Sequence, residues 1–149
     1  MGGGKPETQT KTNERERCLP KQSGRRKIVL LNPTPSFELL TCWELEKQSD
    51  AYEFLSAGSA EEVPALCGEA FAFIAGIASS SACMAKERKE LCAKVREAAP
   101  NCKILWLIDV SVCSELTQTA IRTKRSGIID QFVYNGISPI YLAAVLDTL

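Results

Sequence analysis

The sequence predicts an α/β fold in which buried parallel strands alternate with helices. Residues Ala70–Ile77 (AFAFIAGI) form a continuous apolar run, too short for a membrane span, which is typical of a strand buried on both faces. Strand-like runs of this kind alternate with helix-like patterns five times along the chain. Such alternation predicts a parallel sheet with helices on both faces and right-handed connections.

The strands are predicted from short apolar runs bounded by turn residues. The first is followed by Pro33 and Pro35, which cannot donate a hydrogen bond to a neighbouring strand. The others are bounded by glycine, serine, asparagine or proline. The predicted strands are Lys27–Leu31, Ala51–Leu55, Phe71–Gly76, Lys103–Ile108 and the last four residues of Ile128–Tyr134.

Five helices are predicted from apolar spacing and from capping signals. Ser59 with Glu62 three residues later forms a capping-box pattern, Gly127 is a helix C-terminal signal, and Ser138 followed by Pro139 marks a helix start. The predicted helices are Phe37–Gln48, with Ser36 as N-cap, a short one from Ser59 to near Gly68, Ala82–Ala98, one from Ser111 or Ser114 to about Lys124, and one from Ser138 towards Leu149.

The 149 residues divide into a polar tail and one domain. Residues 1–26 lack apolar periodicity and hold seven basic and three acidic residues, so we expect a disordered polar and basic tail. Residues 27–149 hold 11 basic and 15 acidic residues and make up the predicted domain. A weakly acidic body with a weakly basic tail does not favour direct nucleic-acid binding.

The cysteines are expected to be reduced and structural. There are seven, none paired in a C-x-x-C spacing, and the chain has no histidine, so we predict no metal site. Most lie in apolar patterns, where a thiol acts as a small hydrophobic group. No secretory signal or membrane span is evident, and we therefore expect a cytoplasmic protein.

The five βα units resemble the receiver domain of two-component response regulators. The most specific match is Ser126–Leu142, which is similar to the family's segment Gly-Ala-x-x-Tyr-Leu-x-Lys-Pro-Phe-Ser-Pro-x-x-Leu, and the opening Lys27–Leu31 is also receiver-like. The resemblance covers the chain apart from its tail. It implies a flavodoxin-like (βα)5 fold with strand order 2-1-3-4-5.

The resemblance also implies where the chemistry of a receiver would lie. Receivers bind Mg²⁺ with two acids after the first strand, accept a phosphoryl group on an Asp at the end of the third, and contact that group with a Thr or Ser after the fourth and a Lys after the fifth. The matching positions here hold Asn32 and Pro33, Ala75, a residue at or next to Asp109, and Asn135. Because alanine cannot form an acyl phosphate, the sequence resembles a pseudo-receiver, and we expect no enzymatic activity and no cofactor.

Asp109 has two interpretations. It can be a displaced acid at the edge of the sheet, near Ser79–Ser81, or it can cap the loop or helix after the fourth strand, with the serines capping the preceding helix.

The favoured function is a stand-alone, phosphorylation-independent interaction module of the two-component or phosphorelay class. In receivers the fourth helix, fifth strand and fifth helix commonly form a partner or dimer surface, so we expect another signalling protein or a second copy to bind there. Tyr134 and Tyr141 are the candidate interface aromatics, with the gap-filling role beside the sheet as the other interpretation. The chain ends at Leu149, within or at the end of the fifth helix, so we expect no output domain.

The alternative function is a small flavodoxin-like protein that binds a flavin or another ligand. Such a protein would hold phosphate in the loop after the first strand. Here that loop, Asn32–Ser36, has two hydroxyl groups, two prolines and no glycine, so it offers few backbone N–H donors.

Overall fold

The computed structural model describes residues 24–32, 39–77, 82–108 and 114–149. The strands are β1 (Arg26–Leu31), β2 (Tyr52–Ser56), β3 (Ala72–Ile77), β4 (Lys103–Ile108) and β5 (Gln131–Tyr134). The helices are α1 (Leu40–Gln48), α2 (Val63–Leu66), α3 (Ala82–Ala98), α4 (Ser114–Arg125) and α5 (Pro139–Asp147), and the short 3₁₀ helices η1 (Ala60–Glu62) and η2 (Cys67–Glu69) flank α2.

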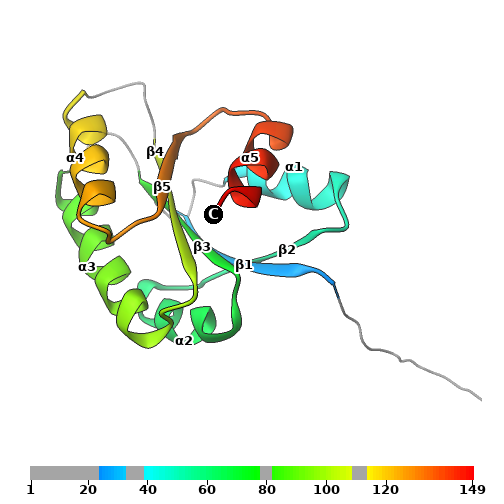
Figure 1. The fold of residues 1–149 in the computed structure, drawn as a ribbon, viewed down its shortest axis with the longest axis horizontal. Helices are drawn as coiled ribbons and strands as arrows, with labels where there is room; N and C mark the ends of the chain where they lie inside the picture. Colours follow the sequence, from blue (N-terminus) through cyan, green and yellow to red (C-terminus); the bar gives the residue numbers. More distant parts are fainter. Residues whose placement is uncertain (1–23, 33–38, 78–81, 109–113) are drawn as a thin grey trace, which may run out of the picture.

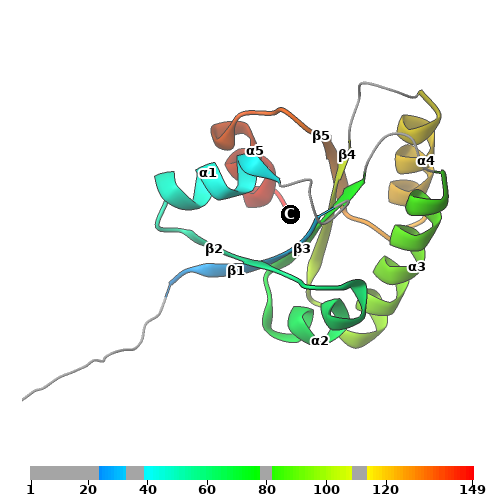
Figure 2. The same ribbon diagram turned by 180° about the vertical axis from the view of Figure 1, so that it is seen from behind.

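The five strands form one parallel sheet in the order β2-β1-β3-β4-β5, which confirms the predicted strand order. Helices α1 and α5 cover one face, and α2, α3 and α4 cover the other (Figures 1 and 2). Strand β5 is an edge strand, with α4 to one side and α5 to the other in Figure 1.

Alternation along the strands divides the core into two apolar clusters, one for each face. In β3, Phe73, Ala75 and Ile77 belong to the cluster beneath α2, α3 and α4, whereas Ala72 and Ile74 belong to the cluster beneath α1 and α5. Successive side chains of a strand point to opposite faces, so both faces of a covered strand must be apolar. This requirement explains why the central strands are continuous apolar runs.

The structure differs from the predicted boundaries by small shifts. The first strand begins at Arg26, inside the predicted tail, and the second and third strands lie one residue later than predicted. The last helix ends at Asp147, two residues before the chain end. The first helix begins at Leu40 with Leu39 as its N-cap residue, which corrects the predicted start at Phe37 and the predicted cap at Ser36. Residues 1–23 lie outside the described residues, so the disordered tail stays a prediction.

The capping predictions have mixed outcomes. Ser138 caps α5, since its Oγ accepts a hydrogen bond from the Tyr141 backbone N–H at 3.1 Å, and Gly127 has a φ of 85° after α4, as predicted. The capping box at Ser59 is wrong, because its hydroxyl makes no cap bond and instead donates to Glu62 Oε2 at 3.5 Å. The predicted single helix there is three short pieces, η1, α2 and η2.

Candidate functional site

The candidate site lies where the carboxyl ends of β1 and β3 meet, because ligands of open parallel sheets bind beyond that edge. Leu31 of β1 pairs with Ala75 of β3, so the next residues, Asn32 and Gly76, lie level with each other. Pro33, Ser79–Ser81 and Asp109 lie outside the described residues, so both interpretations of Asp109 stay open.

Ala75 lies two residues before the end of β3. It is fully buried between its strand neighbours Leu31 and Trp106, and its methyl group belongs to the apolar cluster on the α3 side of the sheet. An ionised carboxylate in that cluster would carry a large desolvation cost. Shifting the alignment by one residue reaches Gly76, which is also neutral.

A buried arginine of α3 occupies the edge between β1 and β3. Arg88 is 8% exposed. Its Nε donates to the Gly76 carbonyl at 3.3 Å, and its NH2 group donates to the Asn32 carbonyl at 3.2 Å. Burial lowers the pKa of the Arg88 guanidinium, and Glu87 opposes that shift. A guanidinium stays charged in proteins, so a fixed cation joins the two strand ends.

Sequence reasoning missed Arg88, although a signal for it was present. The residue lies within a charged run, Lys86–Glu90, which is typical of a solvent-exposed helix face. Yet it lies four residues after Met84 and three before Leu91, on the same side of the helix as those apolar residues. Helical spacing, and not the local charge, indicates the burial of Arg88.

The described residues of this edge do not fit a magnesium ion. Such an ion needs several oxygen ligands, commonly carboxylates, but Asn32 supplies one neutral amide, and the carbonyls of Asn32 and Gly76 already accept bonds from Arg88. The Asn32 Oδ1 atom is buried without a hydrogen-bond partner. Nowhere in the described ranges do three His, Cys, Asp or Glu side chains gather as a possible metal site.

The turn after β5 also departs from the receiver pattern. The Asn135 N–H donates to the Ile108 carbonyl at 2.7 Å, which continues the pairing of β4 and β5. Gly136 then adopts a φ of 96°. Proline is locked near −65°, so the Lys-Pro pair of the family cannot take this conformation at residues 135 and 136.

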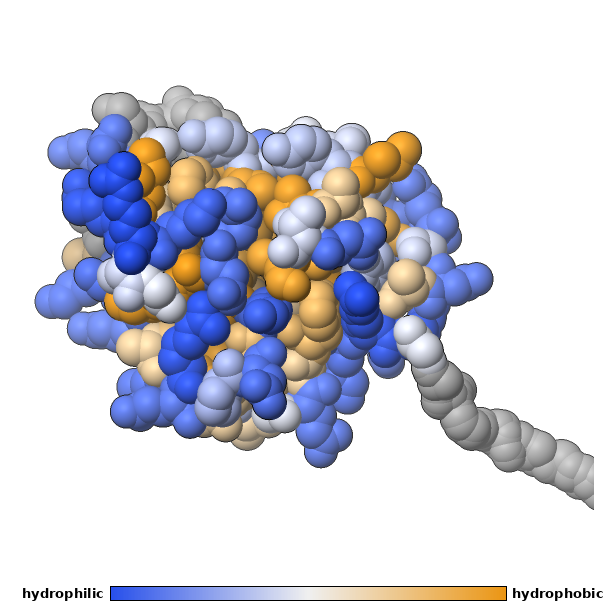
Figure 3. Space-filling view, viewed as in Figure 1, coloured by the Kyte–Doolittle hydropathy of each residue, from blue (hydrophilic) through white to orange (hydrophobic). Residues whose placement is uncertain are grey.

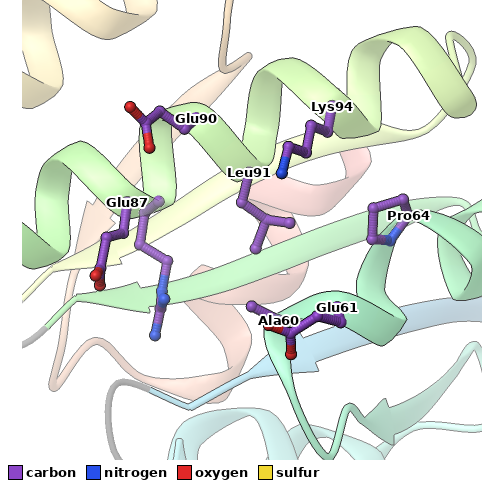
Figure 4. A pocket seen from close by; sticks show the side chains of 8 residues that line it. Ala60, Glu61, Pro64, Glu87, Glu90, Leu91 and Lys94 are labelled. Carbon is purple, nitrogen blue, oxygen red and sulfur yellow. The ribbon is translucent and has the colours of Figure 1, made fainter.

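A groove of about 480 Å³ runs along α3 beside Arg88 (Figure 4). Glu61 and Pro64, from the segment before β3, face Leu91 and Lys94 of α3 across it. The sequence alone does not predict this groove, because its two walls belong to segments that meet only when α2 packs against α3.

The two predicted interface tyrosines lie in different environments. Tyr141 of α5 is 56% exposed, and its neighbour Ile140 is 79% exposed. Tyr134 of β5 is half-buried and packs edge-on against Phe132, with ring centroids 6.1 Å apart. Figure 3 shows apolar side chains reaching the surface in the middle of the face that displays β5, with hydrophilic side chains around them.

No family model matches the chain, and no curated protein sequence matches it significantly. Solved structures do match. A CheY-like protein, TadZ, from Pseudomonas aeruginosa has a TM-score of 0.62 at 17% identity, covering 83% of this chain and 98% of that one. A pilus assembly-related protein from Burkholderia pseudomallei has a TM-score of 0.62 at 14% identity, covering 87% and 92%. A response regulator receiver domain from Clostridium thermocellum has a TM-score of 0.61 at 16% identity, covering 83% and 92%.

These likenesses establish the fold. The chain has the flavodoxin-like, CheY-like arrangement of five parallel strands in the predicted order. At identities below 20% they show the fold alone, and function depends on the residues described above. In the described part of the chain, every helix is too short or too polar to cross a membrane.

Proposed function

We propose that this protein is a receiver-like signalling module that acts by docking to a partner, without phosphorylation. The observation that carries the proposal is the buried Arg88 guanidinium, which bridges the Asn32 and Gly76 carbonyls at the edge where receivers hold their metal ion and phosphoryl group. The similar solved structures, several of them described as receiver or CheY-like proteins, support the signalling class.

The residues at the carboxyl ends of β1 and β3 support a module that carries out no phosphotransfer. Phosphoryl transfer to a receiver needs a carboxylate nucleophile, with cations that neutralise the phosphoryl oxygens. Ala75 is a buried methyl group, and Gly76 has no side chain. Arg88 supplies a cation, but it is committed to two backbone carbonyls. The strand ends are therefore held in one arrangement.

The proposed docking surface is formed by α4, β5 and α5. The last turn of α4 is basic, with Arg122, Lys124 and Arg125. Beside it lies an apolar hollow of about 360 Å³, lined by Ile121, Lys124, Arg125 and Phe132. This combination favours a partner that presents an apolar side chain next to acidic residues, which another signalling protein or a second copy of the chain can supply.

Incubation with acetyl phosphate and Mg²⁺ tests the absence of phosphotransfer. We expect intact-mass spectrometry to find no acyl-phosphate adduct, while an ordinary receiver treated in parallel is modified. A stable phosphoryl adduct on any aspartate, Asp109 included, would overturn the proposal.

Substitutions on α5 test the docking surface. Ile140→Asp and Tyr141→Asp replace exposed apolar groups, so the fold should survive while partner capture or self-association falls at least tenfold. Leu55→Asp is the matched control, because Leu55 is a 40% exposed apolar residue on β2. Strand β2 is the outermost strand on the side of the sheet away from β5. Equal effects of the α5 and β2 variants would contradict the assignment of this face.

A further inference from the structure

Two cysteines meet at the amino edge of the sheet, far from the carboxyl edge described above. Cys67 opens η2, shortly before β3, and Cys102 directly precedes β4. Strands β3 and β4 are neighbours, with Ala72 level with Lys103. The Lys103 N–H also donates to the Phe71 carbonyl at 2.9 Å. The two turns that carry the cysteines therefore lie side by side.

The two cysteines share one buried environment. Both belong to the apolar cluster beneath α3, and hydrogen bonding between the two side chains is the main cause of the pKa shift of each thiol. The Cys102 thiol can also donate to the Lys103 carbonyl, with 3.6 Å between the sulfur and oxygen atoms. Both cysteines are free thiols, 35 positions apart in the chain.

The environment distinguishes the two thiols. The hydrogen bond from Cys67 lowers the pKa of Cys102; Arg96 lowers it further, whereas burial and Asp130 act against it. The same bond raises the pKa of Cys67, together with burial. Cys102 is thus the thiol that ionises first, and Cys67 keeps its proton next to it. A thiolate beside a second thiol is the arrangement of redox-responsive cysteine pairs.

The other buried cysteines lack this arrangement. The Trp106 indole N–H donates to the Cys92 sulfur at 3.3 Å, and burial raises the pKa of Cys92 to about 11. Cys42 lies in the opposite cluster, across the sheet, and burial raises its pKa to about 12. Neither is a good nucleophile at neutral pH.

We propose that Cys67 and Cys102 form a redox-active pair that closes to an intramolecular disulfide when the protein meets hydrogen peroxide. The Cys102 thiolate attacks the peroxide O–O bond and takes one oxygen as a sulfenic acid, and the hydroxide released becomes water with a proton from solvent. The Cys67 sulfur then attacks the Cys102 sulfur, loses its proton, and displaces the oxygen as a second water. Two thiols and one peroxide thus give one disulfide and two waters.

Access to the pair depends on small openings of the two turns. Cys67 is 1% and Cys102 is 2% exposed, but their chain neighbours Gly68, Glu69 and Asn101 are exposed. Local opening of such turns requires much less than global unfolding. We therefore expect a small oxidant to react and a bulky thiol reagent to react much more slowly. A dithiol reductant should restore both thiols.

The test uses the full chain with Cys18, Cys83 and Cys113 changed to serine, which removes the exposed cysteine and the two outside the described residues. After hydrogen peroxide treatment, we expect two thiols to be lost and non-reducing peptide mapping to find residues 67 and 102 joined. Cys42→Ser in this background is the matched control and should form the same cross-link. A cross-link that includes Cys92, or a folded protein that keeps all its thiols, would overturn the proposal.

Trapping of the intermediate gives a second measurement that does not need the disulfide. In Cys67→Ala the sulfenic acid at Cys102 has no resolving thiol, so dimedone labelling of Cys102 should rise at least fivefold over the parent. In Cys102→Ala, Cys67 should stay unlabelled. Circular dichroism verifies that both variants are folded. Labelling of Cys67 in place of Cys102 would contradict the assigned roles.

Discussion

The two edges of the sheet each hold an arginine, and the two are bound in different ways. At the carboxyl edge, Arg88 is 8% exposed, and its guanidinium donates to the carbonyl of Asn32, just after β1, and to that of Gly76, one residue before the end of β3. At the amino edge, the side chain of Arg26 is 48% exposed, 3.6 Å from Asp147 and 4.5 Å above the ring of Phe71. Exposed ion pairs contribute little to stability, whereas a buried cation must keep its partners.

The two edges also differ in the side chains that they offer for chemistry. The edge where receivers carry out phosphotransfer has a neutral buried residue, Ala75, and a cation held by backbone oxygens. The thiol pair of Cys67 and Cys102 lies at the other edge. Our proposals therefore assign no phosphotransfer to the carboxyl edge and a redox-active thiol pair to the amino edge.

Ala75→Asp gives the largest expected effect. It places a carboxylate in the apolar cluster, so we expect the free energy of unfolding at pH 7 to fall by about 3 kcal/mol or more. Urea denaturation followed by circular dichroism measures this change. Ala93→Asp, at an exposed position of α3, should change stability by less than about 0.5 kcal/mol.

Retained stability in Ala75→Asp, with acyl phosphate formed from acetyl phosphate, would contradict this expectation. It would mean that the carboxyl edge still accommodates receiver chemistry once the acid is supplied.

Arg88→Met should have the next largest effect. It keeps much of the aliphatic volume but leaves the Asn32 and Gly76 carbonyls without their donor, and each unsatisfied buried group costs roughly 1–3 kcal/mol. Because the Arg88–Asn32 bond is only part-buried, we expect a total loss of about 2–4 kcal/mol. The measurement is the urea midpoint at constant m-value.

Lys89→Met is the control for Arg88→Met, because Lys89 is the exposed neighbour on the same helix. Its stability should stay close to that of the parent protein. Equal stability of the two variants would mean that Arg88 is not the bridge between the strand ends.

The sequence predicts the sheet well because burial on both faces leaves a distinct pattern. Lys103–Ile108 was predicted with its observed boundaries, and Ala72–Ile77 differs by one residue at each end. Such shifts arise where small residues such as Ala70 and Gly76 fit a strand or a turn equally well. The segment from Ser59 to Glu69 was less predictable, since Pro64 and Gly68 interrupt the helix and split it into short pieces.

Local sequence predicts only part of the candidate site. The alignment with receivers identified neutral residues at the strand ends, but the contacts of Arg88 join residues 56 and 12 positions apart. The shared environment of Cys67 and Cys102 likewise follows from the pairing of β3 with β4. Contacts of this kind follow from topology, which the resemblance supplied, and from side-chain placement, which only the structure supplies.

Tyr52→Phe tests the amino edge and should give the smallest effect. The Tyr52 hydroxyl donates to Asp147 Oδ1 at 2.7 Å, so its loss should cost about 1 kcal/mol at pH 7.

Burial, together with the bond to Asp147, raises the pKa of Tyr52 from 10.0 to about 12, so the folded protein holds the phenol proton more tightly than the unfolded chain does. This stabilisation is therefore complete below pH 10 and is lost as the pH rises towards 12. The difference in unfolding free energy between the parent and Tyr52→Phe should shrink over that range, whereas Tyr141→Phe, at an exposed position, should follow the parent throughout. A difference that stays constant from pH 8 to about 12 would contradict this expectation and would show that Tyr52 contributes packing alone.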